Sequence, residues 1–158
     1  MRRVNGTSGR RGFSLVELAV VVIIIGVLAA FGVPRFRDAV ERSKASEAFS
    51  FLASVRSAQE RFQARQGRYA TKIGDLDINV TAPKFFVDSS KAVIGAATAF
   101  TDTSVGTTPG WKLSLVRQAT SSSYGEYSVI FSDGGFDTVN STIANDSDLN
   151  ARINPIGN

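Results

Sequence analysis

The feature that most constrains this chain is an apolar segment, residues 13–34, in which Glu17 is the one charged residue. A helix rises about 1.5 Å per residue, so the segment is long enough to cross the roughly 30 Å hydrocarbon layer of a bilayer. An acid costs about 3 kcal/mol at the centre of such a helix and less near an end, so the many Val, Ile, Leu and Phe side chains outweigh it. We therefore expect residues 13–34 to insert into a membrane.

The net charge of the chain lies ahead of this segment. Residues 1–12 contain Arg2, Arg3, Arg10 and Arg11 and no acid, so they carry the whole formal charge of +4. Overall charge therefore gives no support to nucleic-acid binding. Basic residues before a span favour an N-terminus in the cytoplasm, which places residues 35–158 across the membrane. Charges after the span make this preference modest: Arg35, Arg37, Asp38, Glu41, Arg42 and Lys44.

The composition excludes several classes of enzyme. The 158 residues include no Cys and no His. Disulfides, thiol nucleophiles, Cys/His zinc sites and imidazole catalysis are therefore excluded. The chain also lacks a glycine-rich phosphate loop followed by a lysine. We expect no enzymatic activity and, apart from the calcium site considered below, no cofactor.

A specific pattern surrounds the start of the apolar segment. A basic leader ends at Gly12, Phe13 follows it, Glu17 comes four residues later, and the apolar run continues to Pro34. The local sequence is Arg11-Gly12-Phe13-Ser14-Leu15-Val16-Glu17-Leu18. This combination resembles the processing site of type IV prepilins and of the related pseudopilins. The resemblance is strong over residues 10–35 and weaker up to about residue 80.

The resemblance implies both processing and assembly. A prepilin peptidase would cut the leader, residues 1–12, between Gly12 and Phe13 and would then N-methylate Phe13. In this family Glu17 would pair with the N-terminal amine of a neighbouring subunit, so we predict that Glu17 sets the register of filament assembly. The chemistry agrees, because glycine lets a protease approach the backbone closely and opposite charges about 4 Å apart attract by about 4 kcal/mol at an effective dielectric of 20. The implied partners are other copies of the subunit, the prepilin peptidase, inner-membrane lipid and an inner-membrane assembly platform of the pilus or secretion type.

Two simpler interpretations of the apolar segment stay open. It is a cleaved secretory signal that ends near Ala29-Ala30, or it is an uncleaved membrane anchor. Neither gives a role to Glu17, which a simple anchor on its own would have no reason to contain.

Helical periodicity continues beyond Pro34 through an amphipathic half, residues 35–66. Its apolar residues recur at spacings of three and four, and Gly67 follows as a C-cap. Pro34 removes one hydrogen bond and should kink the helix, while Gly26 and Gly32 weaken nearby turns. The resemblance implies a loss of helicity here in filaments, and a kink without further role is the alternative. The apolar stripe comprises Ala45, Phe49, Leu52, Val55, Ala58 and Phe62.

The remaining residues, 67–158, are expected to form a three- or four-stranded antiparallel sheet packed on this stripe. Apolar and polar residues alternate in residues 111–116 and 127–131, and Asp133-Gly134-Gly135 predicts a turn before a further strand over 136–143. The expected fold class is α+β, with a long kinked N-terminal helix on the sheet, as in type IV pilins. Since there is no disulfide, apolar packing should hold the last loop through Val139, Ile143, Leu149 and Ile153.

Two charged groups suggest further sites. Four acids in the last loop offer the oxygen ligands that Ca²⁺ prefers, although the spacing of a known calcium loop is absent: Asp133, Asp137, Asp146 and Asp148. Major pseudopilins often carry calcium in a comparable loop. A stripe of Arg56, Arg61, Arg65 and Arg68 is either a DNA contact or a solvated helix face, and Glu60 interrupts it.

Three functions follow from these observations. The preferred one is a structural subunit of a type IV pilus-like filament, acting in adhesion, twitching motility or DNA uptake. The alternative is a type II secretion pseudopilin with a C-terminal calcium site. The third is a membrane-anchored periplasmic binding domain that does not polymerise. The precursor is expected in the bacterial inner membrane and the mature chain in an extracellular pilus or a periplasmic pseudopilus.

Overall fold

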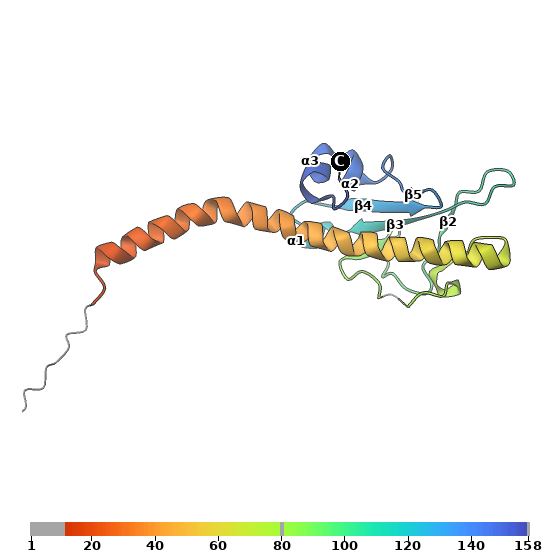
Figure 1. The fold of residues 1–158 in the computed structure, drawn as a ribbon, viewed down its shortest axis with the longest axis horizontal. Coiled ribbons are helices and arrows are strands. Elements are labelled where there is room, and N and C mark those ends of the chain that lie inside the picture. Colours follow the sequence, from red (N-terminus) through yellow and green to blue (C-terminus); the bar gives the residue numbers. More distant parts are fainter. Residues whose placement is uncertain (1–11, 80, 158) are drawn as a thin grey trace, which may run out of the picture. The chain divides into compact units, whose positions relative to one another are not determined.

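A computed structural model of the chain describes residues 12–79 and 81–157. The basic leader up to Arg11 lies outside the described residues. The chain divides into two compact units, Met1–Arg37 and Asp38–Asn158. The second unit is called the globular unit below, and Figure 1 shows its elements.

The helix α1 covers Leu15–Gln66. It begins later than Phe13 because Ser14 caps it, with its Oγ accepting a hydrogen bond of 3.3 Å from the backbone N–H of Val16. It ends where predicted, because Gly67 takes a φ of 71° and its N–H donates to the Gln63 carbonyl at 2.8 Å. The helical assignment runs through Gly26, Gly32 and Pro34 in this single chain, so the loss of helicity there stays a prediction.

The first unit exposes its apolar surface. Every residue from Phe13 to Val33 is exposed within this chain, including the large Val, Ile, Leu and Phe side chains. Among the described residues, α1 is the helix that is long and apolar enough to cross a membrane, by length and composition. An apolar face of this size is unstable in water and requires lipid or other helices around it.

The globular unit contains a five-stranded antiparallel sheet. The strands run in the order β1-β3-β4-β5, and β2 also pairs with β3. The two long central strands confirm the predicted alternation, with Leu115 opposite Val129 and both side chains buried. The bounds are β1 Phe86–Asp88, β2 Thr101–Asp102, β3 Trp111–Arg117, β4 Tyr127–Ser132 and β5 Gly135–Phe136. Two 3₁₀ turns complete this part, Ile73–Asp75 and Ala119–Ser121.

The strand predicted over residues 136–143 is wrong beyond Phe136. Asp137 ends the pairing because its carboxylate accepts hydrogen bonds from the backbone N–H groups of Val139 at 3.1 Å and Asn140 at 2.9 Å. Such a side-chain turn competes with the ladder of a sheet. Two short helices follow instead, α2 over Thr142–Asn145 and α3 over Ser147–Ile153.

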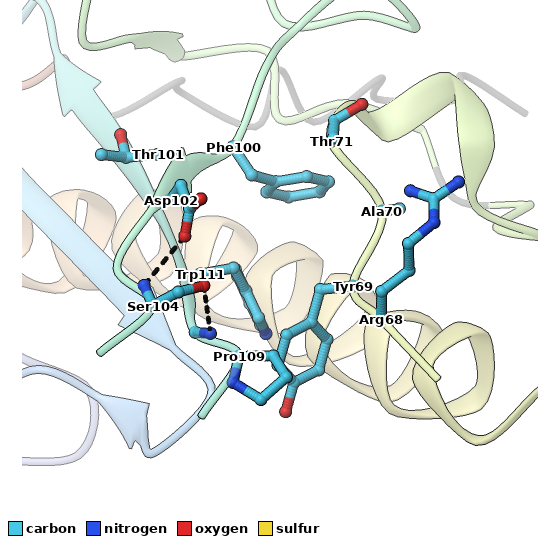
Figure 2. A pocket seen from close by; sticks show the side chains of 11 residues that line it. Arg68, Tyr69, Ala70, Thr71, Phe100, Thr101, Asp102, Ser104, Pro109 and Trp111 are labelled. Carbon is cyan, nitrogen blue, oxygen red and sulfur yellow. Dashed lines mark hydrogen bonds between the residues drawn. The ribbon is translucent and has the colours of Figure 1, made fainter. Parts of the chain in front are cut away.

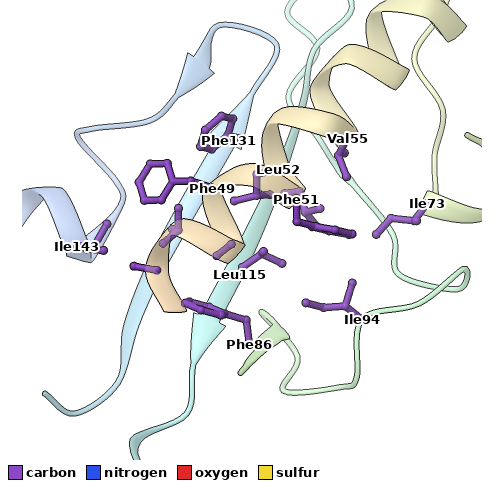
Figure 3. Packing of buried hydrophobic residues seen from close by; sticks show 14 of the residues in the cluster. Phe49, Phe51, Leu52, Val55, Ile73, Phe86, Ile94, Leu115, Phe131 and Ile143 are labelled. Atoms are coloured by element: carbon purple, nitrogen blue, oxygen red, sulfur yellow. The ribbon is translucent and has the colours of Figure 1, made fainter. Parts of the chain in front are cut away.

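The core forms between the second half of α1 and one face of the sheet. The predicted stripe is confirmed, since five of its six residues are buried and Phe62 packs against them partly buried. Figure 3 shows Phe49 and Leu52 with Phe131 and Leu115 of the sheet, and the rings of Phe49 and Phe131 meet edge to face at 5.8 Å. Fully burying one such side chain stabilises the fold by roughly 1.5–3 kcal/mol.

The last loop is held without a covalent bond, as predicted, but not by every expected residue. Ile143, Leu149 and Ile153 are buried in the core. Val139 is 74% exposed, because the turn at Asp137 directs it outward, so its predicted packing role is wrong. The buried Ser141 hydroxyl accepts a hydrogen bond of 2.9 Å from the backbone N–H of Ile130 and so ties α2 to β4.

Candidate assembly site and the polar anchor of the globular unit

The predicted processing residues lie just before α1. Gly12, Phe13 and Ser14 have no helical or strand structure, and Phe13 is 74% exposed. A side chain added at Gly12 would meet no atom within 4 Å. The peptide bond between Gly12 and Phe13 is therefore open to an approaching enzyme within this chain.

Glu17 occupies the first turn of α1 among exposed apolar neighbours. Its carboxylate has no hydrogen bond or ion pair with any residue in the part of the chain that the structure describes. The positive end of the helix dipole favours an acid at this position by roughly 0.3–1 kcal/mol, which is less than the cost of placing a carboxylate in hydrocarbon. A cation from outside the described residues would neutralise the Glu17 carboxylate.

A second acid of α1, Glu41, has the opposite surroundings. It is 4% exposed, and its Oε1 accepts hydrogen bonds of 2.6 Å from Arg117 Nε and 3.0 Å from the Tyr127 hydroxyl. Lys44 donates to the other oxygen at 3.3 Å. The Arg117 side chain is itself fully buried and also donates to the carbonyl of Phe85 at 3.3 Å. We call this group the Glu41 cluster.

The electrostatics of the Glu41 cluster favour the ionised acid. Burial by itself raises the pKa of Glu41, but the hydrogen bonds from Arg117 and Tyr127 and the charge of Arg117 outweigh it and lower the pKa. Burial raises the pKa of Tyr127, and the neighbouring Glu41 carboxylate raises it further, so Tyr127 stays protonated as a donor. A buried charge is tolerated when it is paired and hydrogen-bonded in this way.

Asp38 makes a similar link closer to the surface. Its carboxylate pairs with Arg152 of α3 at 2.9 Å and accepts a hydrogen bond from the Tyr124 hydroxyl. Arg152 also pairs with Asp148 at 3.3 Å and lies over the Tyr124 ring, 5.2 Å from its centroid. The contacts connect α1 to the last helix of the chain.

Sequence reasoning missed both links, because it counted Asp38 and Glu41 only as charges beside the membrane span. The sequence does contain a pattern that indicates the Glu41 cluster. Glu41 precedes Ala45 by one helical turn and so lies on the buried stripe, and Arg117 continues the inward alternation of Leu113 and Leu115. Two ionisable residues of opposite charge at inward positions indicate a buried pair.

The structure does not bring the four predicted calcium ligands together. Asp137 and Asp146 accept from backbone N–H groups of the turns that they begin, and Asp148 pairs with Arg152. Asp133 accepts from the backbone N–H that begins β3. Within residues 12–79 and 81–157 no group of three or more acidic side chains lies close enough to hold a metal ion. The four carboxylates therefore do not form one ligand set among the described residues, because each has a local partner.

The predicted arginine stripe is largely neutralised. Arg61 and Arg65 both pair with Asp77, at 3.1 and 3.3 Å, and Arg56 pairs with Glu60 at 3.2 Å. The solvated helix face therefore describes these residues better than a DNA contact does.

Comparison with known proteins adds a family match. The family model described as "Prokaryotic N-terminal methylation motif" matches residues 7–33. This range contains Gly12, Phe13 and Glu17 and most of the exposed apolar part of α1. No solved structure matches the chain significantly.

Several curated relatives match part of the chain. Fimbrial protein EcpC of Eikenella corrodens is 34% identical over 88 residues, 56% of each chain. Type IV major pilin protein PilA of Myxococcus xanthus is 47% identical over 60 residues, 38% of this chain and 27% of the relative. Type II secretion system core protein G of Pectobacterium carotovorum is 36% identical over 80 residues, 49% of this chain and 51% of the relative. The chain thus spans about half, or less, of the length of these relatives.

Proposed function

We propose that this chain, which is similar over part of its length to type IV pilins and to a type II secretion core protein, is a structural subunit of a type IV pilus-like filament. One observation carries the proposal: the first half of α1 exposes a continuous apolar surface and one unpartnered acid, Glu17. Lipid covers such a surface in a stored precursor, and neighbouring helices cover it in a filament. The subunit then acts by assembling, in adhesion, twitching motility or DNA uptake.

The proposal gives a role to each predicted site residue. A prepilin peptidase removes residues 1–12 by cutting after Gly12 and methylates the new amine of Phe13. That amine keeps its positive charge and pairs with Glu17 of a neighbouring copy, which satisfies the acid and sets the register. Before assembly the N-terminus faces the cytoplasm and the globular unit faces the periplasm, where an inner-membrane platform extracts the subunit.

A pseudopilin is the second candidate. The similarity to a type II secretion core protein, 36% identical over 80 residues, favours it. Both candidates share the processing and the helix-mediated assembly, and they differ in where the polymer is found. A calcium site would not separate them here, because the four acids of the last loop are apart.

The test is to shear filaments from cells that carry the chain and to determine its N-terminus by mass spectrometry. Abundant protein beginning at N-methyl Phe13 in the sheared fraction supports the pilus subunit. The same N-terminus confined to the membrane fraction supports the pseudopilin. A chain that still begins at Met1 contradicts both and leaves a membrane-anchored binding domain.

The role of Glu17 is tested by Glu17→Ala, with Glu60→Ala as the matched control on the exposed face of the same helix. We expect Glu17→Ala to be cleaved and membrane-inserted as usual but to yield no filaments. Glu60→Ala should assemble normally. Wild-type filament yield from Glu17→Ala would remove Glu17 from the assembly mechanism.

A further inference from the structure

Two arginines follow the apolar segment directly and have no role in the assembly mechanism. Arg35 and Arg37 lie in α1 just after Pro34, on either side of Phe36. Both arginine side chains are exposed, and neither has a hydrogen bond or an ion pair with any of the described residues. Phe36 is 69% exposed as well. We call Arg35 and Arg37 the arginine pair.

The carboxylates of the globular unit are already engaged within the chain. Each of them accepts a hydrogen bond or forms an ion pair there. Asp77, for example, pairs with Arg61 and Arg65 at 3.1 and 3.3 Å. Glu17, the one acid of the described chain without such a contact, lies at the other end of the apolar segment. A neighbouring copy would therefore have to give up a contact of its own to supply the arginine pair with an anion.

The position of the arginine pair on the helix favours a surrounding layer over a single partner. Successive residues of an α-helix are about 100° apart, so Arg35 and Arg37 lie about 200° apart around the axis. A chain packed on one side of α1 would reach one of them, whereas the headgroups of a bilayer surround a spanning helix and reach both. The apolar residues 15–34 of α1 extend about 30 Å, the thickness of the hydrocarbon layer, so both arginines follow at the level of the headgroups.

The chemistry of arginine selects the phosphate of the headgroup. A guanidinium donates two parallel hydrogen bonds to a phosphate, and its apolar stem can lie along the lipid while the charge stays at the surface. We propose that the arginine pair binds the phosphate groups of anionic phospholipids and so holds the stored subunit at a fixed depth in the membrane. This inference rests on the proposed function, because it requires the apolar segment to be inserted. Assembly then breaks these contacts when the subunit leaves the membrane.

The experiment places a fluorescent reporter between the two arginines. The full chain with Phe36→Trp is reconstituted in phosphatidylcholine vesicles that contain brominated phosphatidylglycerol or brominated phosphatidylcholine. Bromine quenches a tryptophan only at close contact, and the chain without Phe36→Trp gives the contribution of Trp111, its one tryptophan, which is subtracted. Both lipids have a phosphate, but the choline cation neutralises that of phosphatidylcholine. We expect phosphatidylglycerol to bind beside position 36 roughly fivefold more tightly, and about 1 M salt to remove most of this preference.

Glutamine variants of the reporter chain assign the preference to the arginine pair. Arg35→Gln with Arg37→Gln removes both cations, so the two lipids should quench equally. The matched control is Arg61→Gln with Arg65→Gln, which removes the same charge from the same helix at two arginines that pair with Asp77. It should keep the preference of the reporter chain. All four arginines are exposed, so we expect the variants to fold as the parent does.

Several results would overturn the inference. Equal quenching by the two lipids in the reporter chain would remove it and leave the proposed function intact. No quenching by either lipid would contradict both, because position 36 would then not lie at a bilayer. A preference that survives in Arg35→Gln with Arg37→Gln would belong to other groups, and a preference lost in the matched control would reflect general charge attraction.

Two further outcomes would assign the arginine pair to another partner. Loss of the preference on addition of inorganic phosphate at constant ionic strength would make free phosphate the ligand. Quenching that falls as the protein-to-lipid ratio rises, without a preference for phosphatidylglycerol, would make a second copy of the chain the partner.

Discussion

The two halves of α1 use the same kinds of residue for opposite purposes. In the half from Leu15 to Val33 every side chain is exposed within the chain, whereas the half within the globular unit buries a stripe against the sheet. Each half contains one acid in an apolar setting. Glu41 has Arg117, Tyr127 and Lys44 around it, and Glu17 has no partner within the described chain. An acid on an apolar face needs a cationic partner, which Glu41 finds inside the chain and which we propose Glu17 finds in a neighbouring copy.

The largest expected effect removes one member of the Glu41 cluster. Glu41→Ala leaves the buried Arg117 cation without its anion, so it should destabilise the globular unit by about 3–5 kcal/mol. Glu60→Ala, which removes an exposed acid, should cost no more than about 1 kcal/mol. Urea unfolding followed by Trp111 fluorescence measures both. A cost below about 1 kcal/mol for Glu41→Ala would show that the Glu41–Arg117 pair does not stabilise the globular unit.

The double variant Glu41→Leu with Arg117→Met sharpens the same point. Replacing both charges by apolar side chains removes the desolvation cost together with the attraction. We expect most of the lost free energy of unfolding to return. If the double variant were as unstable as Glu41→Ala, the geometry of the hydrogen bonds, rather than an unpaired charge, would account for the loss.

A leucine in each half of α1 tests the packing contrast directly. Leu52→Ala opens a cavity in the core and should cost about 2–5 kcal/mol. Leu28→Ala removes the same atoms from an exposed position, so the unfolding of the globular unit should change by less than about 0.5 kcal/mol. The same urea titration reports both variants. Equal costs would mean that the exposed half contributes to the fold of the globular unit.

The Glu41 cluster also predicts a pH dependence with a definite sign. The pKa of Glu41 is lowered in the folded state, so its contribution is fully present above the ordinary carboxyl value near 4.5 and is lost as the pH falls through the lowered value. The urea midpoint of unfolding, measured at pH 6, 4.5 and 3, should therefore be lowest at pH 3. The unfolding midpoint of the double variant Glu41→Leu with Arg117→Met should fall less steeply, since only the other acids still contribute to its pH dependence. Identical curves for the wild type and the double variant would show that Glu41 does not contribute to the loss of stability at acid pH.

The smallest effect concerns the pair between Asp38 and Arg152, which is partly exposed. Arg152→Gln should cost about 0.2–1 kcal/mol, and the cost should shrink in high salt because exposed ion pairs are screened. Lys91→Gln breaks a more exposed pair with Glu126 and should have almost no effect. A salt-independent loss in Arg152→Gln would assign the contribution to its contact with the Tyr124 ring instead.

Local patterns predicted the long helix and the two central strands. The stripe from Ala45 to Phe62, the cap at Gly67 and the two central strands follow from the spacing of apolar residues and from the backbone freedom of glycine. The error at residues 136–143 has a local cause as well. The Asp137 side chain bonds its own turn, and this competes with strand pairing in a way that alternation of apolar residues does not reveal.

The sequence by itself determined the apolar segment, its single acid and the faces on which α1 and the strands would pack, and it is also the source of the predicted processing site at Gly12 and Phe13. These depend on neighbours within a few positions, where periodicity and side-chain chemistry are decisive. Only the tertiary structure decided which charges meet. Arg117 reaches Glu41 across 76 positions, and the rings of Tyr69 and Phe100, from separate segments, meet the Trp111 indole edge to face (Figure 2). Such contacts depend on how the helix, strands and loops are registered against one another, which no local pattern specifies.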